Sequence, residues 1–196
     1  DDFKQKSENI LKKLKDNNNL SNIVKGVGVP FFMPKRKHED IGNELTKNYL
    51  FSLKNSFKDE NPNYEFTNHC KDNLIDSITV HNKSKHDEFI KKLENEIIVG
   101  YYFPALLEYS FSAAHETLTR LPDNFYIAGG YDTCAAFIGS PNLLLNEDSY
   151  PPLLWMIALK SNKLDIGYHI EAYGHDLNFN KRPHLDNVAE YWGHSL

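Results

Sequence analysis

The stretch Pro104–Leu118, with the sequence PALLEYSFSAAHETL, is apolar on most faces when it is wound as a helix. Leu107, Phe111, Ala114 and Leu118 recur at spacings of three and four residues, the period of an α-helix. Pro104 suits the first turn of a helix, where its missing N–H is not needed. The stretch therefore predicts a central buried helix and a mainly α fold.

Helical periodicity also extends over most of the remaining chain. We expect an irregular helical bundle, with a small β-hairpin or strand pair near 23–33 or 166–172, folded as one domain over residues 1–196. An N-terminal helical subregion over residues 1–60 is a further option. Ser84 is expected to cap the helix that follows it. The other expected helices cover 3–15, 39–58, 66–80, 85–99, 133–145, a segment from 151, and 183–196, while 166–179 fits helix or strand.

Composition sets the class of protein. The chain has 196 residues, 40% of them hydrophobic and 25% charged, which is typical of a globular domain. The sequence holds no apolar run of the roughly 18 residues that a membrane helix needs. Its two cysteines, Cys70 and Cys134, are too few for a stapled secreted fold and are expected to be reduced. We therefore expect a cytoplasmic protein with no membrane partner.

Charge and aromatic residues are unevenly distributed. Residues 1–98 carry 17 Lys and Arg against 16 Asp and Glu, whereas residues 99–196 carry 5 against 11. The second half also holds 16 of the 25 Phe, Tyr and Trp residues. Aromatic residues are enriched at protein interfaces, and negative charge steers association with basic partners. The one short basic run, at 35–37, is too little for a nucleic-acid surface, so no nucleic-acid partner is expected.

These features favour a partner-binding surface on the loops of the second half. An alternative is that the aromatic residues simply fill the core. The predicted partner-binding residues are Phe125, Tyr126, Tyr131, Asp132, Glu147 and Asp148.

The histidines give a different hypothesis. His169, Glu171 and His175 are close in sequence, and His115 could add a ligand, so these four residues are the candidate set for a divalent metal. His-Glu-x-x-His, Cys-x-x-Cys and a phosphate-binding glycine loop are all absent. A metal-dependent hydrolase or toxin is therefore kept as the alternative, and the favoured hypothesis uses neither metal nor other cofactor.

Three short motifs resemble one protein family. They are Val99-Gly100-Tyr101 at a predicted helix end, Gly130-Tyr131-Asp132 in a predicted loop, and Leu143-Leu144-Leu145 before an acidic turn. Together, within Ile97–Leu145, they resemble the middle of the PoNi-type helical immunity proteins, which protect bacteria from their own secreted nuclease toxins. The match at Gly167–Ala172 is partial. The resemblance implies a helical fold and a cognate protein toxin as partner.

The favoured function is an immunity or antitoxin-like protein that neutralises a cognate, basic nuclease toxin by protein–protein interaction. This hypothesis leans away from an enzyme. A third option is a secreted effector or adaptor without catalysis.

Overall fold

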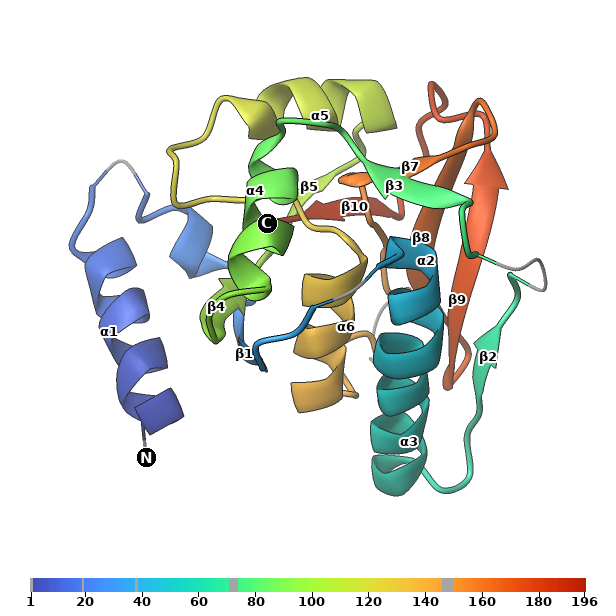
Figure 1. Cartoon of the computed structure of the whole chain (residues 1–196), viewed down its shortest axis with the longest axis horizontal. Coiled ribbons are helices and arrows are strands. Elements are labelled where there is room, and N and C mark those ends of the chain that lie inside the picture. The colour runs from blue at the N-terminus through green and yellow to red at the C-terminus, as the bar shows by residue number, and fades with distance from the viewer. Residues whose placement is uncertain (1, 19, 38, 71–73, 146–149) are drawn as a thin grey trace.

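The computed structural model describes residues 2–18, 20–37, 39–70, 74–145 and 150–196 (Figure 1). The prediction of a mainly α bundle is wrong. Within the described residues, a six-stranded mixed sheet and two two-stranded sheets form an α/β fold together with the helices. The protein is therefore not mainly helical but combines helices with β-sheets.

The described elements end with five successive strands, whereas helices and strands are mixed in the part before them. The helical segments are α1 (Asp2–Lys15), η1 (Ile23–Lys25), α2 (Ile41–Glu44), η2 (Leu45–Leu50), α3 (Phe51–Glu60), α4 (Lys85–Leu93), α5 (Phe111–Thr119) and α6 (Gly130–Gly139). The strands are β1 (Val29–Met33), β2 (Phe66–Asn68), β3 (Ile78–Val80), β4 (Ile98–Tyr102), β5 (Pro104–Leu107), β6 (Leu153–Trp155), β7 (Leu159–Ser161), β8 (Ile166–Tyr173), β9 (Asp176–Pro183) and β10 (Trp192–Ser195).

The large sheet has the strand order β2-β9-β8-β6-β10-β5. Its longest pairing is the β8–β9 hairpin, which runs from Ile166 opposite Pro183 to Tyr173 opposite Asp176. Gly174 lies in the turn with φ of +62°, a conformation that favours glycine. β10 runs parallel to β6, and β2 runs parallel to β9, while the other pairs are antiparallel. The sheet thus brings the end of the chain into its interior.

Two hydrophobic cores lie on opposite faces of this sheet. Leu154 and Met156 of the β6 region belong to the core that contains α6, η2 and α3. Leu153 and Trp155 alternate with them and belong to the core beside α5. Because both faces are covered, all of β6 is buried. The predicted strand pair near 166–172 is part of the sheet, as β8.

The predicted central helix is divided into two elements. Its first part is strand β5, in which Leu107 is 50% exposed, and its second part is helix α5, in which Ala114 and Leu118 are buried. Ser110 starts α5 at a position inside the predicted helix, since its side chain accepts a hydrogen bond from the Ala113 N–H. α5 covers one end of the fold (Figure 1).

The helix in the middle of the molecule is α6 (Figure 1). All eight residues from Gly130 to Phe137 are buried, as expected for a helix with neighbours on every side. It packs against β1, β4, η2 and α3. The sequence predicts a loop for Gly130-Tyr131-Asp132, and this is wrong, because these residues are the first turn of α6.

Other predicted helices form strands in whole or in part. The segment 66–80 contains β2 and β3, and 85–99 divides into α4 and the start of β4. The segment from 151 leads into β6, and 183–196 ends in β10.

The predicted helix over 3–15 is confirmed, and the one over 39–58 is confirmed as α2, η2 and α3, with a π-helical middle. Ser84 caps α4 as predicted, accepting from the Asp87 N–H. Cys70 and Cys134 are buried and not disulfide-bonded, as predicted.

The two-core arrangement predicts which positions of β8 matter for stability. Ile170 is fully buried, so Ile170→Ala is expected to lower the free energy of unfolding by about 2–5 kcal/mol. Tyr173, in the same strand, is 74% exposed, and Tyr173→Ala should change it by less than about 0.5 kcal/mol. Urea unfolding of the two variants and the wild type measures both values. Equal losses would contradict the assignment of β8 to a sheet covered on both faces.

Candidate functional site

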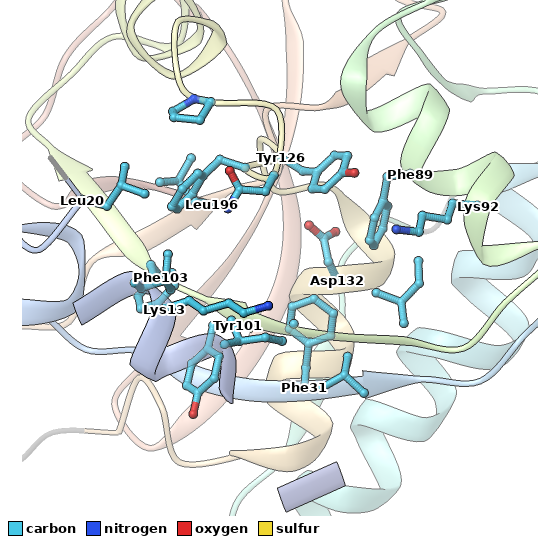
Figure 2. A pocket seen from close by; sticks show the side chains of 18 of the residues that line it. Lys13, Leu20, Phe31, Phe89, Lys92, Tyr101, Phe103, Tyr126, Asp132 and Leu196 are labelled. Atoms are coloured by element: carbon cyan, nitrogen blue, oxygen red, sulfur yellow. The ribbon is translucent and has the colours of Figure 1, made fainter. Parts of the chain in front are cut away.

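A cavity of about 530 Å³ lies between α1, β1, β4, α4 and the segment that leads into α6 (Figure 2). α1 packs against β4 at one side of the molecule (Figure 1). Leu196, the last residue of the sequence, also lines the cavity. Because its walls come from elements far apart in the sequence, the cavity exists only in the folded chain.

Several of the residues that line the cavity are aromatic. Phe89 and Tyr126 contact each other with ring centroids 5.2 Å apart, and Tyr101 and Phe103 stack at 5.7 Å. The six aromatic residues that line the cavity are Phe31, Phe89, Tyr101, Phe103, Phe125 and Tyr126. Such a wall favours a ligand with an apolar or aromatic body.

Two glycines leave room for rings of this wall. A Cβ atom at Gly100 would lie 2.6 Å from the ring of Phe31, and one at Gly28 would lie 2.4 Å from the ring of Phe103. Both distances are too short for a carbon–carbon contact. The absence of these side chains therefore lets Phe31 and Phe103 lie directly against the backbone.

Asp132 is the acidic residue of the cavity wall. Its carboxylate accepts hydrogen bonds from the Gly129 N–H, with N–O distances of 2.9 Å to Oδ1 and 3.1 Å to Oδ2, and so caps α6. The residue is 4% exposed. Burial raises the pKa of Asp132 above its ordinary value, and the nearby His86 and the backbone hydrogen bonds oppose this rise.

His86 of α4 lies behind this cap. Its Nδ1 donates to the Ile127 carbonyl oxygen at 3.0 Å, because a carbonyl oxygen can only accept. Nε2 is buried without a hydrogen-bond partner in the described part of the chain, and a Cβ at Gly129 would lie 2.3 Å from it. Burial lowers the pKa of His86, and the nearby Asp132 and the hydrogen bond to Ile127 oppose this shift.

Two lysines complete the cavity. Lys13 comes from α1 and Lys92 from α4, and the side-chain nitrogens of both point inward (Figure 2). Lys92, in the last turn of α4, has a loose ion pair at 3.6 Å with the exposed Glu96, which follows the helix. The described residues offer Lys13 no ion pair. The cavity thus combines an aromatic wall, one buried carboxylate and two ammonium groups.

The structure places the predicted partner-binding residues in two settings. Phe125, Tyr126 and Asp132 line the cavity. Tyr131 points into the core instead, where its ring stacks on Tyr49 at 4.4 Å. Glu147 and Asp148 lie outside the described residues. Sequence reasoning missed Lys13, Lys92 and the strand β4, because their contribution depends on the packing of α1 and α4 around the cavity.

The four alternative metal ligands are not brought together. His115 lies beside His81, with ring centroids 5.7 Å apart, and His175 stacks on Tyr64 at 4.7 Å. His169 and Glu171 do share one face of β8. Across the described ranges, no three His, Cys, Asp or Glu side chains form a group that could hold a metal ion.

His169 and Glu171 instead form a charged cluster with Arg182 of β9. Glu171 Oε1 lies 3.4 Å from His169 Nε2, and Arg182 donates to Glu171 Oε2 at 2.9 Å. Partial burial raises the pKa of Glu171, but the hydrogen bonds and charge of its two partners outweigh this and lower it to about 2. His169 lowers the pKa of Glu171 most and Arg182 adds to this effect, while burial lowers the pKa of His169 itself. The cluster links β8 to β9.

Comparisons with family models, with curated proteins and with solved structures found no match to this chain. The resemblance to PoNi-type immunity proteins stays a prediction. Val99-Gly100-Tyr101 lies in strand β4, and Gly130-Tyr131-Asp132 forms the first turn of α6. None of the described helices combines the length and apolar character needed to cross a bilayer.

The Glu171 cluster predicts a pH dependence of stability. The pKa of this carboxyl is lowered on folding from its usual 4.5 to about 2, so its stabilising effect is complete above pH 4.5 and is lost as the pH falls toward 2. Because Glu171 is partly solvated, we expect this loss to be about 1–2 kcal/mol. Urea unfolding between pH 5 and 2.5 should show a smaller decline for Glu171→Gln than for the wild type. Glu116→Gln, at an exposed site on α5, is the control and should follow the wild type.

Proposed function

We propose that this protein is a binding protein that takes up a small organic molecule with an aromatic or similarly apolar body in the cavity beside α1. The observation that supports this proposal best is that six aromatic side chains line a cavity of about 530 Å³. Ligand pockets for small molecules are typically about 300–1,000 Å³ and mainly apolar, with a few polar groups that orient the ligand.

The way the wall is built supports a preformed site. Gly28 and Gly100 leave room for the rings of Phe103 and Phe31 against the backbone, and the hydrogen bonds to Gly129 hold Asp132. A wall that is ordered before binding loses little conformational entropy when the ligand enters. An apolar ligand gains about 25 cal/mol for each Å² of its surface removed from water, and this gain offsets the translational and rotational freedom that the ligand loses on binding.

The proposal is tested by filling the cavity. Val99 lines it, and Val99→Trp should displace a ligand, whereas Val188→Trp at an exposed position elsewhere should not. The probe is N-phenyl-1-naphthylamine, a neutral aromatic fluorophore whose emission rises in apolar surroundings. We expect saturable binding of one probe per chain, at least tenfold weaker in Val99→Trp, which corresponds to about 1.4 kcal/mol. Equal titrations for all three proteins, with thermal melts showing each to be folded, would refute the proposal.

A protein partner is the second candidate function, supported by an exposed aromatic edge of the sheet. Tyr150 is 70% exposed, and its ring lies 5.8 Å from that of Tyr191, which precedes β10. β5 beside it exposes Leu107 and is followed by the exposed Tyr109. The segments 103–119, 150–159 and 184–196 contain four acidic residues and neither lysine nor arginine. A basic partner, such as the toxin expected for an immunity protein, suits this surface, and like charge opposes self-association through it.

This second candidate has its own test. A partner captured from the native cell by the wild-type protein should be lost with Tyr191→Ala and with Glu190→Lys, since the first removes an aromatic anchor and the second reverses the charge. Tyr173→Ala, at the exposed end of the β8–β9 hairpin, is the control and should retain it. Retention by all three variants would remove this surface from consideration.

The effector hypothesis, the cofactor-free mechanism and the cytoplasmic location stay predictions.

A further inference from the structure

We infer that the ligand of the cavity is a short peptide in extended conformation, which pairs with one edge of β4 and packs an apolar or aromatic side chain against Phe31. This inference rests on the proposed function, since it names the chemical class of ligand for the same cavity. Its basis is the way in which the main chain of β4 adjoins the cavity.

The cavity lies along an edge of β4 rather than over one of its faces. Four successive residues of the strand, 98–101, line it. Successive side chains of a strand point to opposite faces, so a cavity that reaches residues of both faces adjoins the edge between them. β1 occupies the other edge of β4, and the described residues contain no second partner strand for β4.

Two observations indicate which main-chain groups point to the cavity. Pro30 of β1 lies opposite Tyr101, and proline has no N–H for a ladder bond, so the main-chain groups of this pair point away from each other. Directly after β4, Phe103 exchanges main-chain hydrogen bonds of 2.9 and 3.0 Å with Leu196, which lines the cavity. The N–H and C=O groups of alternate residues point to the same edge of a strand. Those of Val99 and Tyr101 therefore point to the side of Leu196, into the cavity.

These groups are available to a ligand. Between described residues, no hydrogen bond outside the pairing with β1 involves the main chain of Val99 or Tyr101. The ladder between β5 and β10 ends with the pair Phe103–Leu196, and the same edge of the chain continues along β4. An extended peptide antiparallel to β4 would continue this ladder, as peptides do when they add a strand to the edge of a sheet.

Helices enclose the space beside this edge from both faces of the β1–β4 pair. On one face, Phe3 of α1 contacts Phe32 of β1, with ring centroids 6.4 Å apart. On the other face, Phe137 of α6 contacts Tyr102 of β4 at 6.5 Å, and α4 packs into the same core. Residues of α1 and α4 both line the cavity. The cavity thus has the layered surroundings that a strand of a sheet requires.

The register gives the middle residue of the ligand an apolar environment. Residues directly opposite each other in an antiparallel pair place their side chains on the same face. A ligand residue opposite Gly100 therefore points to the face of Phe31, whose ring lies over Gly100. Phe89 and Tyr126 belong to the core of Phe31 and also line the cavity (Figure 2). The ligand residues on either side, opposite Tyr101 and Val99, point toward α1.

A series of three peptides tests the inference on the wild-type protein. The parent is acetyl-Ala-Phe-Ala-amide, with phenylalanine as the middle residue. N-methylation of its third residue removes an N–H that faces β4, so binding should weaken by about tenfold or more. N-methylation of the phenylalanine is the matched control, because that N–H faces away from β4, and it should change the affinity by less than about threefold. Calorimetric titration measures the three dissociation constants.

Two variants test the same contact from the side of the protein. Val99→Pro removes the N–H that the third ligand residue would meet, and this N–H is not part of the ladder with β1. Val99→Ala keeps the N–H and is the control. We expect the parent peptide to bind about tenfold more weakly to Val99→Pro than to Val99→Ala. N-phenyl-1-naphthylamine, which has no peptide group, should bind both variants alike.

The outcomes separate this inference from the proposed function. Failure of both the fluorophore and the parent peptide to bind the wild type would refute both. Fluorophore binding without peptide binding, or with equal or reversed effects of the two N-methylations, would overturn the peptide inference and leave the proposed function standing. A loss confined to methylation of the third residue and to Val99→Pro would support it. Thermal melts establish that both variants are folded, and if Val99→Pro is not, the peptide series decides the outcome.

Discussion

The buried start of α6 is the feature around which the rest of the structure is arranged. The first turn of a helix leaves backbone N–H groups without intrahelical partners, and here water cannot reach them. Asp132 reaches back to the Gly129 N–H, and Thr133 donates to the Gly129 carbonyl oxygen at 2.6 Å. Gly129 leaves room for His86, whose ring a side chain at this position would strike. A satisfied helix start can therefore lie deep in the molecule.

Because α6 occupies the centre, the other elements are placed around it. The six-stranded sheet covers one side, with Leu154, Met156 and Ile170 in the shared core, and η2 and α3 cover another. The opposite face of the same sheet holds a second core built on Trp155 and Trp192. Strands that are buried on both faces need apolar residues at successive positions, which β6 provides. This need explains why the sequence there lacks the alternation typical of a surface strand.

The same cap places a carboxylate at the edge of the cavity. Capping requires Asp132 to be close to Gly129, and the aromatic wall of β1, β4 and α4 passes next to that point. One residue can therefore stabilise a helix and face a ligand. This double role also means that the stability and the binding of the protein are coupled at Asp132, whereas Lys13 and Lys92 are on helix surfaces where substitution costs little stability.

The sequence by itself determined the helices that carry a long apolar stripe or a clear cap. The helix over 3–15, the one over 39–58 and the Ser84 cap were predictable, because contacts between residues three and four apart are present within those segments. Phe125, Tyr126 and Asp132, which the sequence predicts as partner-binding residues, line the cavity, and their role in binding a partner stays a prediction.

Only the tertiary structure decided that three short segments are strands. Pro104–Leu107, Leu153–Trp155 and Trp192–Ser195 are three or four residues long, and runs of this length fit a helix or a strand equally well. They are strands because β10 lies between β6 and β5 and supplies their hydrogen bonds, from residues about 40 and 90 positions away along the chain. The tertiary structure also decided the position of Lys13 and Lys92, because the packing of α1 and α4 brings both residues to the cavity. Local periodicity carries no information about such partners, which is why the fold class became visible only in the folded chain.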